Sequence, residues 1–317
     1  MNHFVMRLLG CAWVAASVAH AAPLAAGPVA VGGTAADDRL QLSVGGWFSS
    51  GDSEWQISFP GGRSLLEWAD LEGDLPYVEG EVRVLPWLSL GARYGQGDVE
   101  GQNTDRDWVG NPGGLLGEVL ISKSTARTSG ETTLLDANAY VRLNPASLFP
   151  NAVGTLDLLV GYQQYTEELN DRNGIDGDGR RFAGLDSTFD FEWDIIRVGL
   201  RGQWPVRSWL RLKGEVAALV AADYHGEGFW NLRDDYKRTP PNFEQDADGG
   251  DGVDARVSVE FRPLEYVSVE VGYWLFDLKV EDGRESTYFV DRTRSSEPVD
   301  YAQSARDGLF AAVGVRF

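Results

Sequence analysis

The segment LRLKGEVAALVAADYH, residues 210–225, indicates the fold class because charged positions recur on one face of an extended chain. Its acidic, basic and histidine side chains all occupy odd positions: Arg211, Lys213, Glu215, Asp223 and His225. A period of two puts these side chains on the face opposite Leu212, Val216 and Val220. In a membrane barrel one face meets lipid and the other lines the lumen. We therefore expect Asp223 and His225 to face the lumen. A slip of one residue would expose Arg211 and Lys213 to lipid, at roughly 2–4 kcal/mol each.

The same alternation recurs along the chain from residue 39 onward. It predicts ten strands, near 39–50, 64–85, 88–97, 132–144, 154–168, 187–203, 208–225, 253–262, 266–281 and 306–317. The last strand, AAVGVRF, ends on Phe317 and resembles the terminal signal that bacterial barrel-assembly machinery reads. One continuous barrel domain, residues 39–317, accounts for all ten strands without an internal repeat or linker.

The connections between these strands alternate between short and long. Short connections are expected at 85–87, 144–154, 204–209 and 262–266, and long ones at 98–131, 169–186, 226–252 and 282–305. Aromatic residues that suit a membrane interface stand at the short connections: Trp87, Trp204, Trp209 and Tyr266. We predict an all-β fold, a ten-stranded antiparallel transmembrane β-barrel with long extracellular loops and short periplasmic turns. A soluble β-sandwich would not explain the asymmetry, and side chains can largely fill a ten-stranded barrel, which disfavours a wide pore.

The N-terminal residues are typical of a secretory signal peptide. Arg7 precedes an apolar run, and Ala19-His20-Ala21 offers a cleavage site, so residues 1–21 are expected to be removed. The chain's single cysteine, Cys11, lies in this segment, so we expect neither a disulfide nor thiol chemistry in the mature protein. The Ala/Gly-rich residues 22–38 are expected to be disordered.

The mature chain is strongly acidic, with 27 Lys and Arg residues against 48 Asp and Glu residues. This balance argues against nucleic acid as a partner and favours cations or basic peptides. The acidic segments 171–181 and 246–252 carry aspartates at alternating positions, which leaves calcium binding conceivable. Neither segment completes a twelve-position calcium loop. We predict solvated turns there and no metal or cofactor.

Two short motifs could carry chemistry. Asp105 and Asp107 are two residues apart, so their carboxylates point the same way in an extended segment, and their repulsion raises one pKa. Asp223 and His225 repeat this spacing, and a carboxylate beside an imidazole can fix its tautomer and raise its basicity. The plain alternatives are an exposed acidic loop and a histidine that only satisfies hydrogen bonds. His225 is the only histidine outside the expected signal peptide.

Several motifs together resemble the omptin family of outer-membrane proteases. The matching stretches are GGRSLLEW (61–68), LPWLSLGARYG (85–95), TDRDWVGNPG (104–113), LLVGYQ (158–163) and GLFAAVGVRF (308–317). Asp223-Tyr224-His225 stands in the place of the omptin Asp-x-His. The resemblance runs through most of the mature sequence.

The resemblance implies a surface endopeptidase whose active site faces outward and needs no cofactor. It assigns catalysis to Asp105, Asp107, Asp223 and His225, with a water between the two pairs. His225, oriented by Asp223, would take a proton from the water, which attacks the scissile carbonyl of a peptide or protein substrate.

The chain also departs from the omptin pattern. Ala221 replaces an acid of the family's substrate pocket, while Glu54 could supply the other as a substrate-binding residue. The positions expected to contact lipopolysaccharide are Tyr162, Gln164, Thr166 and Glu192, of which only Tyr162 matches. Cleavage after basic residues and binding of lipopolysaccharide therefore do not follow from the resemblance.

The leading prediction is an omptin-type endopeptidase in the outer membrane. The alternative is a non-enzymatic outer-membrane barrel, an adhesin, receptor or structural protein that binds through its acidic loops. A third reading is a lipid-modifying barrel enzyme, which would need catalytic groups on its lipid face, against the lumen phase expected of Asp223 and His225.

Overall fold

The computed structural model describes residues 39–110, 117–143 and 154–317. These residues form ten strands: β1 (Leu40–Phe59), β2 (Gly62–Leu85), β3 (Leu88–Gly110), β4 (Glu118–Leu143), β5 (Thr155–Asp176), β6 (Asp186–Arg207), β7 (Leu210–Phe229), β8 (Phe243–Leu264), β9 (Val267–Tyr288) and β10 (Arg294–Arg316). The described chain contains no helix that is long and apolar enough to cross a membrane. The predicted signal peptide, 1–21, and the predicted disordered segment, 22–38, lie outside the described residues.

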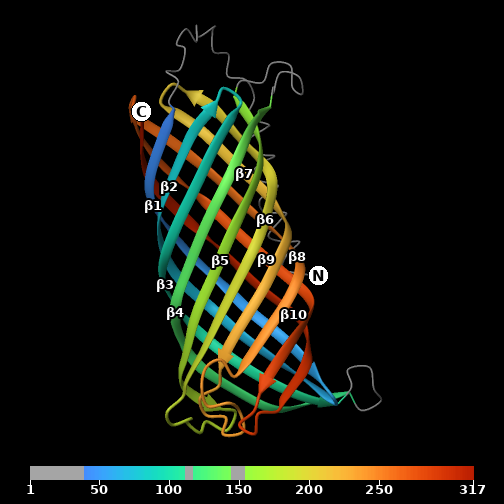
Figure 1. Cartoon of the computed structure of the whole chain (residues 1–317). Helices are drawn as coiled ribbons and strands as arrows, with labels where there is room; N and C mark the ends of the chain where they lie inside the picture. The colour runs from blue at the N-terminus through green and yellow to red at the C-terminus, as the bar shows by residue number, and fades with distance from the viewer. Residues whose placement is uncertain (1–38, 111–116, 144–153) are drawn as a thin grey trace. The chain divides into compact units, whose positions relative to one another are not determined.

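The ten strands form a closed sheet in which each strand pairs antiparallel with its neighbours in sequence (Figure 1). Closure depends on the ladder between β1 and β10, where Trp47 lies opposite Phe310 and Ser53 opposite Ser304. The closed ladder satisfies the backbone of both terminal strands, as a barrel in lipid requires. The predicted ten-stranded antiparallel β-barrel is confirmed.

The two ends of the barrel differ in their connections. We call the end with the β2–β3, β4–β5, β6–β7 and β8–β9 connections the turn end, and the opposite end the loop end. In outer-membrane barrels the short turns face the periplasm and the longer loops face the cell exterior. At the loop end, β1 and β2 are joined by only Pro60 and Gly61, with Gly61 at a φ of +88° that glycine adopts without strain.

The strands are longer than the sequence pattern predicted, at 20–26 residues each. A tilted strand needs only about 9–11 residues to cross a bilayer. β3 and β4 occupy the predicted loop 98–131 apart from residues 111–117, and strands also occupy half of 169–186 and most of 282–305. The predicted extents of these loops were wrong. Beyond lipid, both faces of a strand can be polar, so the alternation fades while the hydrogen-bond ladder continues.

The outer surface toward the turn end carries an apolar band. On β10, Leu309 and Val313 are 59% and 50% exposed, whereas Phe310 between them is 1% exposed and faces the lumen. Trp87, Trp204, Trp209 and Tyr266 are exposed at the turn end, where the sequence placed an aromatic girdle. This arrangement matches a lipid-facing wall.

Side chains fill the lumen at mid-height. The rings of Trp47 and Trp274 stack at a centroid distance of 4.3 Å, and the ring of Trp68 lies 5.0 Å from that of Phe189. Buried charges are paired, as in the ion pair between Arg306 Nη2 and Glu167 Oε1 at 2.6 Å. Breaking such a buried pair leaves an uncompensated charge. The filled interior agrees with the expectation that the barrel is not a wide pore.

The apolar band predicts that a charged side chain on the outer surface lowers the stability of the barrel most where it would lie deepest in the membrane. Val216 lies at the centre of the apolar stretch of β7. The substitution Val216→Arg should destabilise the folded barrel by about 2–4 kcal/mol. Asp190→Arg, on the outer face of β6 beyond the band, should change stability by less than about 1 kcal/mol. Urea unfolding in phospholipid vesicles measures both variants. Equal penalties would contradict a lipid-facing band.

Candidate functional site

Asp105 and Asp107 lie on β3 at the loop end of the lumen. They share the inward phase of Asn103, which is buried. Asp105 pairs with Leu66 of β2 on one side and with Ser124 of β4 on the other. The Ser64 hydroxyl donates a hydrogen bond to Asp105 Oδ1 at 3.5 Å. The two carboxylates therefore point to the same side, as their spacing predicted.

Two carboxyl groups at this end hold their protons unusually well. Burial raises the pKa of Asp105 to about 7, and the neighbouring charge of Asp107 adds to the shift. Burial also raises the pKa of Asp171, on β5, to about 7. Trp68 Nε1 and Thr128 Oγ1 donate hydrogen bonds to Asp171 Oδ1 at 3.3 and 2.5 Å and limit that shift. This end of the lumen can therefore take up protons near neutral pH.

Asp223 and His225 lie on the outer surface of the barrel. Ala222 and Tyr224 are the buried residues, at 0% and 4% exposure, and the ring of Tyr224 packs on Trp193 in the lumen. The predicted lumen phase of Asp223 and His225 was wrong.

An irregularity in β7 causes this reversal. The register shifts between Leu219 and Ala222, and both of these residues are buried although two residues separate them. A bulge of this kind adds one residue to a strand and inverts the alternation beyond it. The alternation that begins at Leu210 therefore does not extend to His225.

His225 is surrounded by acids on the outer wall. Its Nδ1 lies 2.8 Å from Asp246 Oδ1 on β8, its Nε2 lies 3.4 Å from Glu227 Oε1, and Glu192 of β6 is its opposite residue. Burial alone would lower the pKa of His225, but the hydrogen bonds and charges of Asp246 and Glu227 outweigh it and raise the pKa. Asp223 is not one of these two hydrogen-bond partners of the ring. Its carboxylate accepts a hydrogen bond from the Gly249 amide at 3.3 Å.

The structure does not bring the four predicted catalytic residues together. Asp105 and Asp107 face the lumen from β3, whereas Asp223 and His225 face outward from β7, so the barrel wall separates the pairs. A single water cannot contact both. The catalytic roles of these residues remain predictions.

Glu54 also lies away from the lumen. Its neighbours Ser53 and Trp55 on β1 are buried, while its carboxylate accepts hydrogen bonds from Gln303 Nε2 at 2.8 Å and the Tyr301 hydroxyl at 3.2 Å. Burial against these side chains raises the pKa of Glu54. Its role as a substrate-binding residue remains a prediction.

The expected lipopolysaccharide positions form an acidic stretch of the outer wall. The Gln164 amide donates to Glu192 Oε1 at 2.8 Å, and the Tyr162 hydroxyl bonds Asp194.

In the 171–181 turn, Asp176 Oδ1 accepts backbone hydrogen bonds from Asp178 and Arg180. Among the described residues no group of three or more acidic, histidine or cysteine side chains is placed to hold a metal.

The β7–β8 connection, residues 230–242, folds against the barrel mouth and was not singled out in the sequence. Trp230 packs on Phe189 of the lumen at 5.1 Å, and Asn231 Nδ2 donates to Gly184 O at 2.7 Å. Arg233 is bonded to both Asp235 oxygens at 3.1 Å, and its charge also acts on Asp105 and Asp107. Sequence spacing gives no signal for this approach, because Arg233 on the β7–β8 connection and Asp105 on β3 are far apart in the chain.

Comparison with known proteins supports the fold. No protein-family model and no curated protein matches the chain. The outer-membrane protease OmpT from Escherichia coli superposes with a TM-score of 0.71 at 13% identity, covering 88% of this chain and 97% of that one. The translocator domain of the autotransporter NalP from Neisseria meningitidis matches at 12% identity and a TM-score of 0.35, covering 99% and 96% of the two chains. A Pseudomonas aeruginosa FadL homologue matches at 9% identity and 0.33, covering 88% and 91%. The likeness to OmpT shows that the chain has the fold of an outer-membrane β-barrel.

The phase of β7 can be tested by cysteine labelling, because the chain has no cysteine after Cys11. Asp223→Cys and His225→Cys should react rapidly with a bulky maleimide on refolded barrels, since both positions are exposed. Ala222→Cys and Tyr224→Cys should react at least tenfold more slowly, because buried thiols are inert. The opposite order of reactivity would contradict the bulge and support an uninterrupted alternation of β7 side chains from Leu210 to His225.

Asp105 should make stability depend on pH. Its pKa is about 7 in the folded barrel and lies near 4 in the unfolded chain, so the folded state binds the proton more tightly. The resulting stability is complete below about pH 4 and is lost as the pH rises through about 7. Asp105→Asn should stabilise the barrel at pH 8 by on the order of 1–4 kcal/mol and change little at pH 4. Urea titration at both pH values checks this, with the outward-facing Asp98→Asn as control. A pH-independent effect would contradict it.

Proposed function

We propose that this protein is a surface-binding barrel, a receptor or adhesin, that takes basic segments of a partner at its acidic loop end. One observation carries the proposal: Asp105 and Asp107 face the lumen whereas Asp223 and His225 face outward. The loop end thus offers acidic binding groups without the assembled water site that the protease mechanism needs. The sequence analysis gave such a non-enzymatic barrel as the alternative to an omptin-type endopeptidase.

Acidic groups on both faces of the wall support the choice of a basic partner. Inside the mouth, Asp105, Asp107 and Asp171 are joined by Glu285 of β9, whose pKa is raised by burial. Outside it, acids surround His225 on β6, β7 and β8: Asp190, Glu192, Asp223, Glu227 and Asp246. The whole chain carries a formal charge of −20. Such a field attracts cationic ligands over distances of several ångströms, and more so at low salt.

Arg233 supports a guanidinium as the recognised group. A basic side chain of the β7–β8 connection already offsets the charge of Asp105 and Asp107 at the mouth. An arginine of a partner would find the same acids, which suit a guanidinium because carboxylates accept its paired donors.

An omptin-type endopeptidase is the second candidate. The likeness to OmpT, at a TM-score of 0.71, and the two lumen-facing aspartates favour it. In this candidate Asp105, with a pKa of about 7, could accept a proton from water in its ionised form. Recruiting His225 would require β7 beyond Leu219 to shift by one residue, which would turn Tyr224 out of the aromatic lumen.

The outward direction of His225 removes one objection to a lipid-modifying enzyme, but its ring partners do not favour that chemistry. Both groups bonded to the ring in the described structure are carboxylates, Asp246 and Glu227. Acyl transfer through a covalent intermediate needs a hydroxyl or thiol activated by the histidine.

A peptide array separates the two candidates. Refolded wild-type barrel should bind arginine-rich peptides and not acidic ones, more tightly at low salt, and release them uncleaved. Asp105→Asn/Asp107→Asn should weaken binding by about tenfold, equivalent to about 1.4 kcal/mol, because two lumen carboxyl groups are lost. Mass spectrometry detects cleavage, and surface plasmon resonance measures affinity.

The outer-wall variant His225→Ala is the matched control. It should leave binding within twofold, since His225 lies outside the mouth. Cleavage by wild type that disappears in both Asp105→Asn and His225→Ala would establish the four-residue protease mechanism. Failure to bind any basic peptide, with no cleavage, would reject both candidates.

A further inference from the structure

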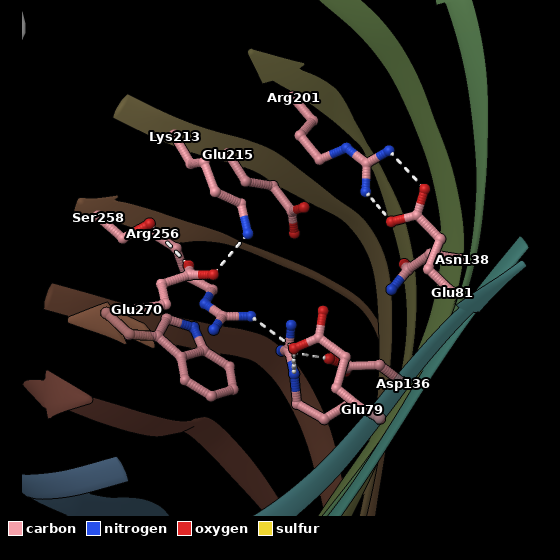
Figure 2. Close-up of polar contacts among 12 residues, drawn as sticks. Glu79, Glu81, Asp136, Asn138, Arg201, Lys213, Glu215, Arg256, Ser258 and Glu270 are labelled. Carbon is pink, nitrogen blue, oxygen red and sulfur yellow. Dashed lines mark hydrogen bonds and ion pairs between the residues drawn. The ribbon is translucent and has the colours of Figure 1, made fainter. Parts of the chain in front are cut away.

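A second site lies at the turn end of the lumen, far from the acidic mouth along the strands. It is a pocket of about 50 Å³ between β1, β2, β6, β7, β8 and β9. Figure 2 shows acids and bases from opposite walls pointing into one space. Four carboxylates and three basic side chains line it, so the pocket presents both signs of charge.

Two of the three bases are fully engaged by carboxylates. Arg201 donates to both Glu81 oxygens, at 2.7 and 3.1 Å, and Lys213 Nζ lies 2.5 Å from Glu270 Oε2. These pairs hold the walls of the pocket in place (Figure 2). Buried charges are tolerated where they are paired in this way.

Arg256 is the exception. Its contact with Glu79 Oε2 is long, at 3.5 Å, and its Nε has no hydrogen-bond partner among the described residues. The side chain is nine-tenths buried, with its guanidinium 4.9 Å from the Trp274 ring centroid and 4.3 Å from that of Phe310. An unmet donor on a buried cation favours an incoming acceptor, and an anionic one most of all.

The carboxylates of the same pocket favour a donor. Glu215 accepts from Arg197 Nη2 at 3.2 Å and from the Tyr140 hydroxyl at 3.4 Å, both near the upper limit for a hydrogen bond. A carboxylate has about four acceptor positions, so Glu215 retains capacity for a cationic donor. Within one cavity, Arg256 therefore favours an anionic group of a ligand and Glu215 favours a cationic group.

A ligand with a single charge fits this lining poorly. A small anion would meet four carboxylates, and a small cation would meet three bases. A molecule with a carboxylate and an ammonium can satisfy both sets and leaves no new buried charge uncompensated. The neutral side chains of Gln203 and Ser43 offer further hydrogen bonds.

The pocket ends blindly toward the barrel centre. Three aromatic side chains are buried there: Trp47, Tyr77 and Trp274. Each lies at least two positions deeper along its strand than the pocket residues of β1, β2 and β9. The stacked indoles of Trp47 and Trp274 fill the lumen at this depth. A molecule entering from the turn end is therefore held and does not pass through.

We propose that the turn-end pocket binds a small zwitterion of the amino-acid class, with its carboxylate on Arg256 and its ammonium toward Glu215. In an outer-membrane barrel the turn end is the periplasmic end. This places a periplasmic solute site beneath a surface-binding site, in one barrel.

Titration calorimetry of the refolded full-length barrel tests the site with three probes of similar size. Glycine should bind saturably, while acetate and methylammonium, which carry one charge each, should bind at least tenfold more weakly. Trp274 lies against Arg256, so tryptophan fluorescence should follow glycine occupancy. Glycine that fails to saturate, or acetate that binds as tightly as glycine, would overturn the proposal; this comparison needs no variant.

Arg256→Gln should weaken glycine binding at least tenfold, because it removes the unmet cationic donor. Arg172→Gln is the matched control, since Arg172 is exposed near the loop end and pairs with Asp186. Heat-dependent gel migration confirms that each variant has folded. Undiminished glycine binding by folded Arg256→Gln would also reject the site.

Discussion

Backbone closure in lipid is the constraint on which the rest of this structure depends. The bilayer offers no partner for an unpaired N–H or C=O, so the first and last strands must join. The ladder between β1 and β10 does this over nearly the whole of both strands, from Gln41 opposite Arg316 to Ile57 opposite Val299. Closure fixes two faces for every strand, and the apolar band and the polar lumen follow from it.

A closed ten-stranded lumen is narrow, and its contents decide what the barrel can do. Stacked indoles and buried ion pairs fill the centre, as Trp47 on Trp274 and Arg306 on Glu167 show. The filled centre leaves solvent-accessible chemistry to the two ends. The loop end collects acids with raised pKa values, whereas the turn end keeps paired charges of both signs around an open pocket. One chain thus presents two chemically different surfaces at the two ends of its barrel.

Local irregularities in the sheet decide which side chains belong to each surface. One extra residue between Leu219 and Ala222 turns His225 from the lumen to the outer wall. There it bonds to Asp246 and Glu227, which favour the protonated imidazole, a poor proton acceptor. The same three-residue motif would have a different chemistry one register away. A resemblance in sequence around Asp223 and His225 therefore cannot by itself identify a catalytic site.

The sequence by itself determined the barrel, its ten strands, the aromatic girdle and the common direction of Asp105 and Asp107, because side-chain alternation is a local property of an extended chain. It did not determine how far the strands extend past the membrane, since ladder hydrogen bonds continue where hydropathy no longer alternates. Only the tertiary structure decided the outward positions of Glu54 and His225, the approach of Arg233 to Asp105, and the unmet donor of Arg256. These features depend on bulges and on pairing between strands distant in the chain, and neither leaves a pattern in the spacing of residues.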